Sequence, residues 1–252
     1  MATKKAETNE FNGRVVVVTG AAAGIGLATA EAFANGGASV ALLDIDPIVT
    51  EVASHIGGAH KGWICDVSNA AEVDRIIAEV ATYFGRIDIL INNAGIGRLA
   101  PAEDLSVTDW DLTMAVNLRG PYLCSRAVAP HMFKNSWGRI ITVASQAAVI
   151  GIEDHVAYSA SKAGLIGMTN CLALEWGRRG ITANAISPTV VETELALVGW
   201  SGEKGEKARA EIPVGRFAQP EEVSSAALFL ASERAAMING ANLMLDGGNT
   251  IC

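Results

Sequence analysis

A tyrosine and a lysine stand four residues apart in the segment Tyr158-Ser-Ala-Ser-Lys162. In a helix this spacing places the phenol and the ammonium on one face. A free tyrosine has a pKa of about 10, and a cation within about 4–6 Å favours its anion. We therefore expect Lys162 to lower the pKa of Tyr158 toward the range that suits general acid–base catalysis.

Ser145 precedes this pair and ends a predicted strand. Its hydroxyl could hydrogen-bond a substrate carbonyl oxygen or hydroxyl. Taken singly, each residue has an ordinary interpretation, because a helical Tyr/Lys pair is more often a solvated face and a serine after a strand is more often a helix cap. The catalytic interpretation therefore depends on where the surrounding elements place them.

A glycine-rich segment, Thr19-Gly-Ala-Ala-Ala-Gly-Ile-Gly26, lies between a predicted strand and a predicted helix. Gly20 permits a tight turn, Gly24 allows close approach of a ligand, and Gly26 lets the helix pack on the strand. The helix N-terminus then offers N–H groups to a pyrophosphate. By its pattern alone the segment could also be an ordinary glycine-rich turn.

An acidic residue follows this segment at the distance expected of a nucleotide site. The second predicted strand ends in Leu42-Leu-Asp44, and an acid about 20 residues past the loop can bind an adenosine ribose. Asp44 would repel a 2′-phosphate, and neither Ile45 nor Asp46 supplies an arginine to offset this. The sequence therefore favours NAD over NADP, with a helix-capping role as the alternative, stronger for Asp46 than for Asp44.

Two further strand ends carry small or polar residues. Asp66 ends the third predicted strand and could meet the adenine amino group or cap the helix that starts near Asn69. The fourth strand ends in Asn92-Asn-Ala-Gly95, where Asn93 and Gly95 suit the close approach of a ligand.

The elements that must position these residues alternate between short β-branched runs and segments of helical spacing. Runs such as Val15–Val18 are apolar on both faces, as in a covered parallel sheet. We predict a doubly wound α/β fold with a parallel seven-stranded Rossmann sheet and helices on both faces. The predicted strands are 14–19, 38–44, 60–66, 87–92, 138–145, 181–187 and 242–246, and the predicted helices are 25–35, 47–56, 69–84, 105–134, 155–179 and 219–231.

The domain boundaries follow from this alternation. Residues 1–12 are expected to be a mobile N-terminal segment, and 13–252 a single domain with the Rossmann fold. Within that domain the glycine-punctuated stretch 188–213 is expected to be a lid loop on the substrate side.

The candidate residues converge at one place in such a fold. The carboxyl ends of parallel strands lie along one sheet edge, where ligands bind. A nucleotide site beside a tyrosine base, without a metal-ligand set or a Ser–His–Asp relay, fits hydride transfer coupled to proton transfer. Six residues each follow a different predicted strand: Gly20, Asp44, Asp66, Asn93, Ser145 and Pro188.

The composition of the chain indicates which binding partners and which cellular compartment to expect. The chain has 252 residues, of which half are apolar and 18% charged, with a net charge of −8. A chain this acidic is not expected to bind nucleic acid. No apolar run approaches a membrane span of about 18 residues, and the N-terminus lacks a secretory pattern. Four widely spaced cysteines favour a reducing compartment, so a cytoplasmic protein is expected.

These motifs together resemble the short-chain dehydrogenase/reductase family from about Asn12 to the C-terminus. The resemblance implies a catalytic tetrad in which Tyr158 is the acid/base, Lys162 lowers its pKa and holds the nicotinamide ribose, Ser145 orients the substrate, and the backbone of Asn117 helps to hold a water relay. The motifs that carry it are Thr19–Gly26, Asp66, Asn92-Asn-Ala-Gly95, Asn117 in Val116-Asn-Leu, Ser145, Tyr158-Ser-Ala-Ser-Lys162 and Pro188.

The resemblance also implies further cofactor contacts and a homotetramer. Thr193 corresponds to the family threonine that contacts the nicotinamide carboxamide. One departure is Pro188-Thr189, where the family usually has Pro-Gly, so the nicotinamide-side loop is expected to differ slightly. The implied cofactor residues are Gly20, Gly24, Ile25, Gly26, Asp44, Asp66, Val67, Asn93, Ala94, Gly95, Tyr158, Lys162, Pro188, Val191 and Thr193.

Within the family, the chain looks most like NAD-dependent polyol dehydrogenases. Gln146, Glu153, His155 and Thr189 are the candidate substrate residues, with Glu153 and His155 alternatively starting a helix and facing water. A 3-oxoacyl thioester reductase is the second interpretation, although such enzymes mostly use NADPH, which Asp44 disfavours. Reduction of another ketone, such as a steroid or quinone, is a third. A non-catalytic nucleotide-binding protein would not need the Tyr/Lys pair.

Overall fold

The structure is a computed structural model that describes residues 9–193, 196 and 199–252. It contains one parallel seven-stranded sheet in the order β3-β2-β1-β4-β5-β6-β7, with the crossover between β1 and β4. The predicted doubly wound fold is confirmed. The strands are β1 Val15–Thr19, β2 Ser39–Asp44, β3 Lys61–Ile64, β4 Ile89–Asn92, β5 Gly138–Val143, β6 Ile181–Pro188 and β7 Asn242–Leu245.

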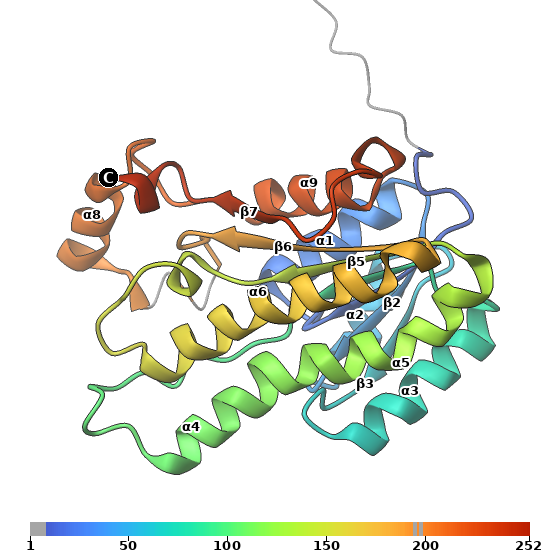
Figure 1. Ribbon diagram of the computed structural model, residues 1–252, viewed down its shortest axis with the longest axis horizontal. Coiled ribbons are helices and arrows are strands. Elements are labelled where there is room, and N and C mark those ends of the chain that lie inside the picture. The colour runs from blue at the N-terminus through green and yellow to red at the C-terminus, as the bar shows by residue number, and fades with distance from the viewer. Residues whose placement is uncertain (1–8, 194–195, 197–198) are drawn as a thin grey trace, which may run out of the picture.

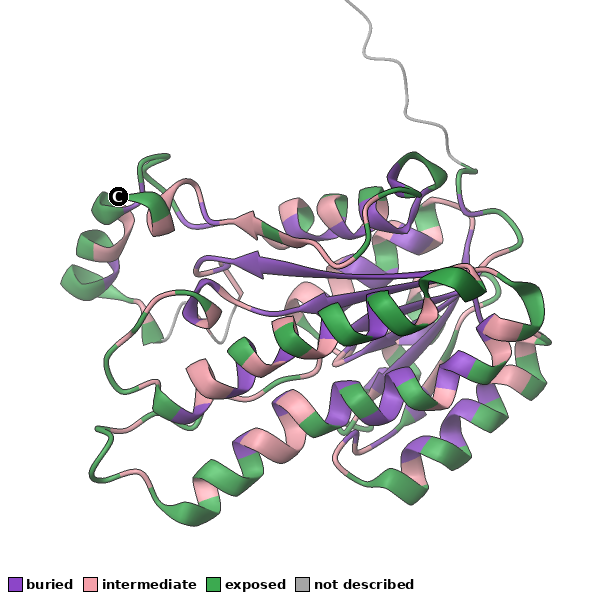
Figure 2. Ribbon diagram, in the orientation of Figure 1, coloured by how far each residue is buried: buried purple, intermediate pink, exposed green. Residues whose placement is uncertain are grey.

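Helices cover both faces of the sheet, as Figure 1 shows. One core cluster joins alternate strand residues such as Val16 and Val18 to α1 and α9, and the other joins Val17 to α3, α5 and α6. The inner strands β2, β1, β4, β5 and β6 are therefore buried from both sides, whereas the edge strands β3 and β7 are partly exposed (Figure 2). The α-helices are α1 Gly24–Asn35, α2 Val49–Ile56, α3 Ala70–Phe84, α4 Val107–Met114, α5 Gly120–Asn135, α6 Val156–Trp176, α8 Gly202–Glu211 and α9 Pro220–Ala231.

The segment predicted as one helix, 105–134, is divided in the structure. α4 and α5 are joined by a π-helical turn, Ala115–Arg119, in which the Gly120 N–H donates to the Ala115 carbonyl oxygen. Such turns are rare and often lie at functional sites. Asn117 lies inside this turn, and hydrophobic periodicity did not predict it because the apolar pattern continues through it.

Two expected boundaries differ from the structure. Phe11 was placed in a mobile N-terminal segment, but its ring is buried and packs edge-on against Phe33, with 4.9 Å between the ring centroids. Its apolar area therefore belongs to the core. In the expected lid, Val191 forms a bridge with Ala218 and α8 occupies Gly202–Glu211. Lid residues 194–195 and 197–198 lie outside the described residues.

Two findings concern membranes and thiols. Among the helices of the described ranges, none has both the length and the apolar character needed to cross a membrane. Cys65 and Cys124 are buried free thiols, and Cys171 and Cys252 are exposed free thiols.

Candidate active site

Tyr158 and Ser145 meet where β5 and α6 approach each other. Tyr158 lies in the first turn of α6, and Ser145 follows the end of β5. The Ser145 hydroxyl hydrogen-bonds the Tyr158 phenol and also accepts the Ala147 N–H at 3.1 Å. Ser145 therefore both caps the short helix Gln146–Ala148 and contacts the tyrosine. Burial raises the pKa of Tyr158, and the hydrogen bond from Ser145 opposes that rise.

Lys162 is buried one helical turn beyond Tyr158. Its Nζ donates to the Val143 carbonyl oxygen at 2.8 Å and lies 5.5 Å from the centre of the Tyr158 ring. Burial lowers the pKa of Lys162 to about 8. In the chain alone burial raises the pKa of Tyr158, so the lowering expected from Lys162 is not found there, and it stays a prediction for the complex with cofactor.

Asn117 holds the loop after β4 through its side chain. Its Oδ1 accepts the Ile96 N–H and its Nδ2 donates to the Ile96 carbonyl oxygen, both at 2.8 Å. Nδ2 also donates to the Ser161 hydroxyl at 3.2 Å. The π turn thus ties the loop that starts at Gly95 to α6. The role expected of the Asn117 backbone, a water relay, stays a prediction.

The glycine-rich loop has the geometry of a phosphate-binding turn. Gly20 and Gly24 have left-handed backbone angles, with φ of +65° and +56°, and a Cβ at Gly26 would collide with the Gly20 carbonyl oxygen. The Asn93 Nδ2 donates to the carbonyl oxygens of Thr19 and Gly20, each at 3.0 Å. In the described part of the chain, no side chain caps the N-terminus of α1. These residues fit a dinucleotide, whose pyrophosphate needs free N–H groups and backbone access.

Asp44 borders this loop. Its Oδ2 accepts the Ala22 N–H at 2.9 Å, and its Oδ1 accepts the Asp46 N–H at 3.0 Å. The carboxylate is thereby fixed beside the glycine-rich loop, as a ribose-binding acid requires. Asp46 accepts the Ile48 N–H in the turn before α2, but the N-cap of that helix is Ile48 and no side chain among the described residues caps it, so the capping role expected of Asp46 is not found.

Asp66 does not cap α3. That helix is capped by Asn69, whose side chain accepts the Glu72 N–H. Asp66 instead accepts the backbone N–H and the hydroxyl of Ser68, at 2.8 and 2.7 Å. The capping alternative is therefore wrong, because Asn69 stands directly at the helix start. The contact of Asp66 with adenine stays a prediction. Val67 is buried, and a Cβ at Gly120 would press against its side chain.

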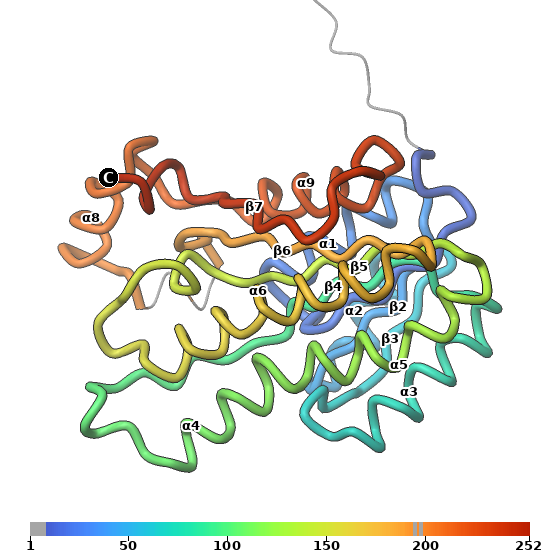
Figure 3. Tube along the Cα trace, in the orientation of Figure 1, coloured from blue at the N-terminus to red at the C-terminus, as the bar shows by residue number. Residues whose placement is uncertain are grey.

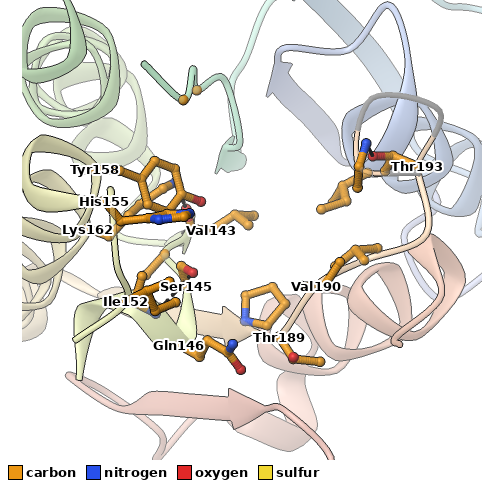
Figure 4. A pocket seen from close by; sticks show the side chains of 18 of the residues that line it. Val143, Ser145, Gln146, Ile152, His155, Tyr158, Lys162, Thr189, Val190 and Thr193 are labelled. Atoms are coloured by element: carbon orange, nitrogen blue, oxygen red, sulfur yellow. Dashed lines mark hydrogen bonds between the residues drawn. The ribbon is translucent and has the colours of Figure 1, made fainter. Parts of the chain in front are cut away.

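A cavity of about 340 Å³ brings the two groups of predicted residues together (Figure 4). It lies at the carboxyl edge of the sheet. Its lining does not include Gly20, Gly24, Gly26, Asp44, Asp66, Val67, Ala94, Asn117 or Glu153. The predicted residues that line it are Ile25, Asn93, Gly95, Ser145, Gln146, His155, Tyr158, Lys162, Pro188, Thr189, Val191 and Thr193.

For Glu153 the structure favours the alternative of a residue that faces water, and its contact with a substrate stays a prediction. Its side chain is exposed and lies outside the cavity lining, because the turn before α6 directs it to water. His155 does line the cavity, edge-on to Tyr158 with 5.9 Å between the rings (Figure 4). The Glu153 carbonyl oxygen can only accept, so His155 Nδ1 is the donor and Nε2 is left as an acceptor.

The structure adds residues that the sequence did not identify. The cavity wall includes the apolar side chains of Ile96, Leu99 and Ile152, whose types carry no functional signal. Asn249 donates from Nδ2 to the Gln146 Oε1 at 2.9 Å, across 103 residues of sequence. No motif indicates this long-range contact. Among the described residues, no group of three His, Cys, Asp or Glu is placed to hold a metal ion.

Comparison with known proteins decides the family. A family model described as Enoyl-(Acyl carrier protein) reductase matches residues 20–250. A D-threitol dehydrogenase of Mycolicibacterium smegmatis is 52% identical over 245 residues, which cover 96% of this chain and 94% of the relative. The chain belongs to the short-chain dehydrogenase/reductase family. The predicted resemblance is thus confirmed.

Further relatives of this short-chain dehydrogenase/reductase agree with both the fold and the predicted subgroup. An NAD-dependent glycerol dehydrogenase of Listeria innocua is 45% identical over 252 residues, 99% of each chain. A solved structure, a 3-ketoacyl-(acyl-carrier-protein) reductase of Brucella melitensis complexed with NADH, matches with a TM-score of 0.90 and 36% identity. It covers 95% of this chain and 99% of that one. The predicted likeness to polyol dehydrogenases is confirmed by the first two relatives.

Proposed function

We propose that the protein is an NAD(H)-dependent oxidoreductase that interconverts a secondary alcohol and a ketone on a small polyol. The observation that carries the proposal is the cavity that Ser145, Tyr158 and Lys162 line together with the polar residues Gln146 and Thr189. The names of the threitol and glycerol dehydrogenase relatives support a polyol substrate.

The cofactor side of the proposal rests on the glycine-rich loop. The backbone N–H groups at the start of α1 would hold the pyrophosphate, and Asp44 would hold the adenosine ribose. When bound, the nicotinamide accepts or gives the hydride. Because Asp44 repels a 2′-phosphate and no arginine stands at 45–46, we propose NAD rather than NADP.

Proton transfer falls to Tyr158. Ser145 orients the substrate oxygen by a hydrogen bond, and Tyr158 takes the alcohol proton during oxidation or returns it during reduction. Burial raises the pKa of Tyr158, so the chain alone keeps this proton at neutral pH. Reduction can use that proton directly, whereas oxidation must first remove it. The oxidation rate should therefore rise with pH in the alkaline range.

A substrate screen tests the proposal. Purified protein is assayed by NADH absorbance at mildly alkaline pH with tetritols, pentitols, hexitols and simple secondary alcohols. A parallel assay supplies NADPH and an acetoacetyl thioester, the substrate of the alternative function. We expect turnover with NAD and a polyol that exceeds turnover in the parallel assay. Faster reduction of the thioester with NADPH would replace the proposal by the thioester reductase.

We also propose that the protein is a cytoplasmic homotetramer. Apolar side chains are exposed on α4 and α5, among them Val107, Leu112 and Tyr122, and Met237 is exposed near β7. Exposed apolar side chains at these places suit burial in contacts between copies of the chain. Light scattering after size-exclusion chromatography tests the tetramer, and fractionation of cells tests the compartment.

A further inference from the structure

We propose that Asn249 is a positioning residue that orients the Gln146 amide, so that the cavity recognises a hydroxyl on the carbon next to the reacting one. The proposal rests on the proposed polyol function and names the feature of the substrate that the site selects. It places Asn249, the first residue of the last turn of the chain, in the substrate-recognition machinery.

The Gln146 amide has one fixed side and one free side. Its side chain is 8% exposed and directly follows Ser145. Oε1 accepts from Asn249 Nδ2 at 2.9 Å, which sets the orientation of the amide. In the described part of the chain Nε2 donates to no protein atom. Gln146 therefore presents a hydrogen-bond donor to the cavity that it lines.

Thr189 supplies the complementary group. It is 8% exposed, and its Oγ1 has no partner among the described residues. Its backbone N–H donates to the Leu245 carbonyl oxygen at 3.1 Å, which holds the residue beside the end of β7. Both residues line the cavity, and in the view of Figure 4 both side chains lie on the side of Ser145 away from Tyr158.

A hydroxyl that accepts from Gln146 Nε2 would donate to Thr189 Oγ1 once the Thr189 side chain turns toward it, because that oxygen is closed off from solvent in the chain alone. Both of its hydrogen-bonding roles would then be satisfied, as would the buried threonine hydroxyl. Because Gln146 directly follows Ser145, which orients the reacting oxygen, we place the recognised hydroxyl on the carbon next to the one that reacts. A substrate without it leaves the buried polar groups unpaired, and a site of this kind rejects such a substrate strongly.

The tail that carries Asn249 is held firmly. The buried Asp246 carboxylate accepts the N–H groups of Gly248 and Thr250, at 3.0 and 2.9 Å, and the Thr250 hydroxyl at 2.6 Å. The Gly247 carbonyl oxygen accepts the Val214 N–H at 3.2 Å. Figure 3 shows the C-terminus beside α8. Asn249 thus stands on a fixed turn, as a positioning residue must.

The test compares a tetritol with 2-butanol, a secondary alcohol without the neighbouring hydroxyl. Both are assayed with NAD for the wild type, Asn249→Ala, Asn249→Asp and the control Ile251→Ala, an exposed neighbour in the same turn. We expect Asn249→Ala to lower kcat/KM for the tetritol about tenfold, mainly through KM, because one hydrogen bond to the substrate is worth about 1.4 kcal/mol. Its kcat/KM for 2-butanol should stay within about twofold, as should both values for Ile251→Ala.

The variant Asn249→Asp tests the same role by reversing the orientation of the Gln146 amide. A carboxylate can only accept, so it would bind the Gln146 Nε2 and turn Oε1 toward the cavity. The loss for the tetritol should therefore be at least as large as in Asn249→Ala. On a Gln146→Leu background, Asn249→Ala should cause no further loss, because the two residues act as one unit. The midpoint of thermal unfolding and the NADH affinity are measured for every variant to show that fold and cofactor site are retained.

The outcomes separate the two proposals. If the wild type oxidises the tetritol but Asn249→Ala keeps its preference over 2-butanol, the positioning role is refuted. Equal loss for both substrates also refutes it, since that is the mark of a merely structural change. If the wild type oxidises neither alcohol with NAD, the proposed function fails, and the recognition proposal falls with it. That result is read from the wild type alone.

Discussion

The glycine-rich loop and the substrate end of the cavity are built on opposite principles. In the loop, the Asn93 amide and the Asp44 carboxylate are occupied by backbone groups of the loop itself. At the substrate end, the Thr189 hydroxyl has no partner among the described residues, and burial displaces the pKa values of Tyr158 and Lys162. The polar side chains at the loop are already hydrogen-bonded within the chain. Burial of the polar groups at the substrate end lowers stability until a ligand binds.

The largest effect should come from removing the proton-transfer group at the substrate end. Tyr158→Phe keeps the ring but removes the hydroxyl that Ser145 contacts. We expect kcat for polyol oxidation to fall by about 10³-fold or more, since general acid–base catalysis supplies about 10²–10⁴-fold. NADH affinity, measured by fluorescence titration, should stay within about threefold, because the cofactor loop is a separate unit. Retained turnover in Tyr158→Phe would contradict the assignment of the proton-transfer residue.

In the loop, a single methyl group should suffice to cause a large loss. Gly26→Ala drives a Cβ into the Gly20 carbonyl oxygen and against the Asn93 amide. The turn must shift, and we expect NADH affinity to fall about 100-fold, which corresponds to about 2.7 kcal/mol. Gly167→Ala in α6 is the matched control, because no atom lies within 4 Å of the added carbon. Equal NADH affinities in the two variants would show that the loop is not rigid.

The same contrast explains what could be predicted from the sequence. The loop residues act through backbone geometry within a short segment, so glycine spacing and the acid at Asp44 indicated them. Gln146 depends on Asn249, which is 103 residues away, and no local pattern records such a pair. The π turn at Asn117 was likewise hidden by continuous helical periodicity. Glu153 was a candidate only because it lies close to Tyr158 in sequence, and the turn before α6 directs it outward.

The cost of burying Lys162 can be measured through pH. Burial lowers the pKa of Lys162 from 10.5 to about 8. Because folding lowers this pKa, the free energy of unfolding is highest above pH 10.5, where the lysine is neutral in both states. It falls as the pH drops from 10.5 through about 8, where the folded state must also take up the proton. At pH 7 we therefore expect Lys162→Met to raise the free energy of unfolding by about 2 kcal/mol, after allowing for the lost hydrogen bond to Val143.

This gain should shrink as the pH is raised from 8 to 10.5, the interval between the two pKa values. Urea unfolding at pH 7 and pH 10 measures it. Lys207→Met, at an exposed lysine of α8, should show no such pH-dependent gain. If the free energies of unfolding of wild type and Lys162→Met change equally between pH 7 and pH 10, burial of Lys162 does not destabilise the fold. The contrast between the substrate end and the loop would then not hold for this residue.

A smaller effect should follow from Asp44→Ala. Removing the carboxylate removes both its repulsion of a 2′-phosphate and its support of the Ala22 N–H. We expect the ratio of kcat/KM for NAD to that for NADP to fall about tenfold, or about 1.4 kcal/mol. Asp46→Ala is the control, because the Asp46 side chain accepts only from the backbone before α2. An unchanged ratio in Asp44→Ala would remove this residue from cofactor selection.

The smallest effect is expected from Glu153→Gln, at a residue just outside the cavity. Glu153→Gln alters an exposed side chain outside the cavity lining, so we expect kcat/KM for the polyol to change by less than about twofold. His155→Ala should change it more, because His155 lines the cavity and presents Nε2 as an acceptor. If Glu153→Gln has the larger effect, the turn before α6 closes over the substrate, and recognition extends beyond the cavity that holds Gln146 and Thr189.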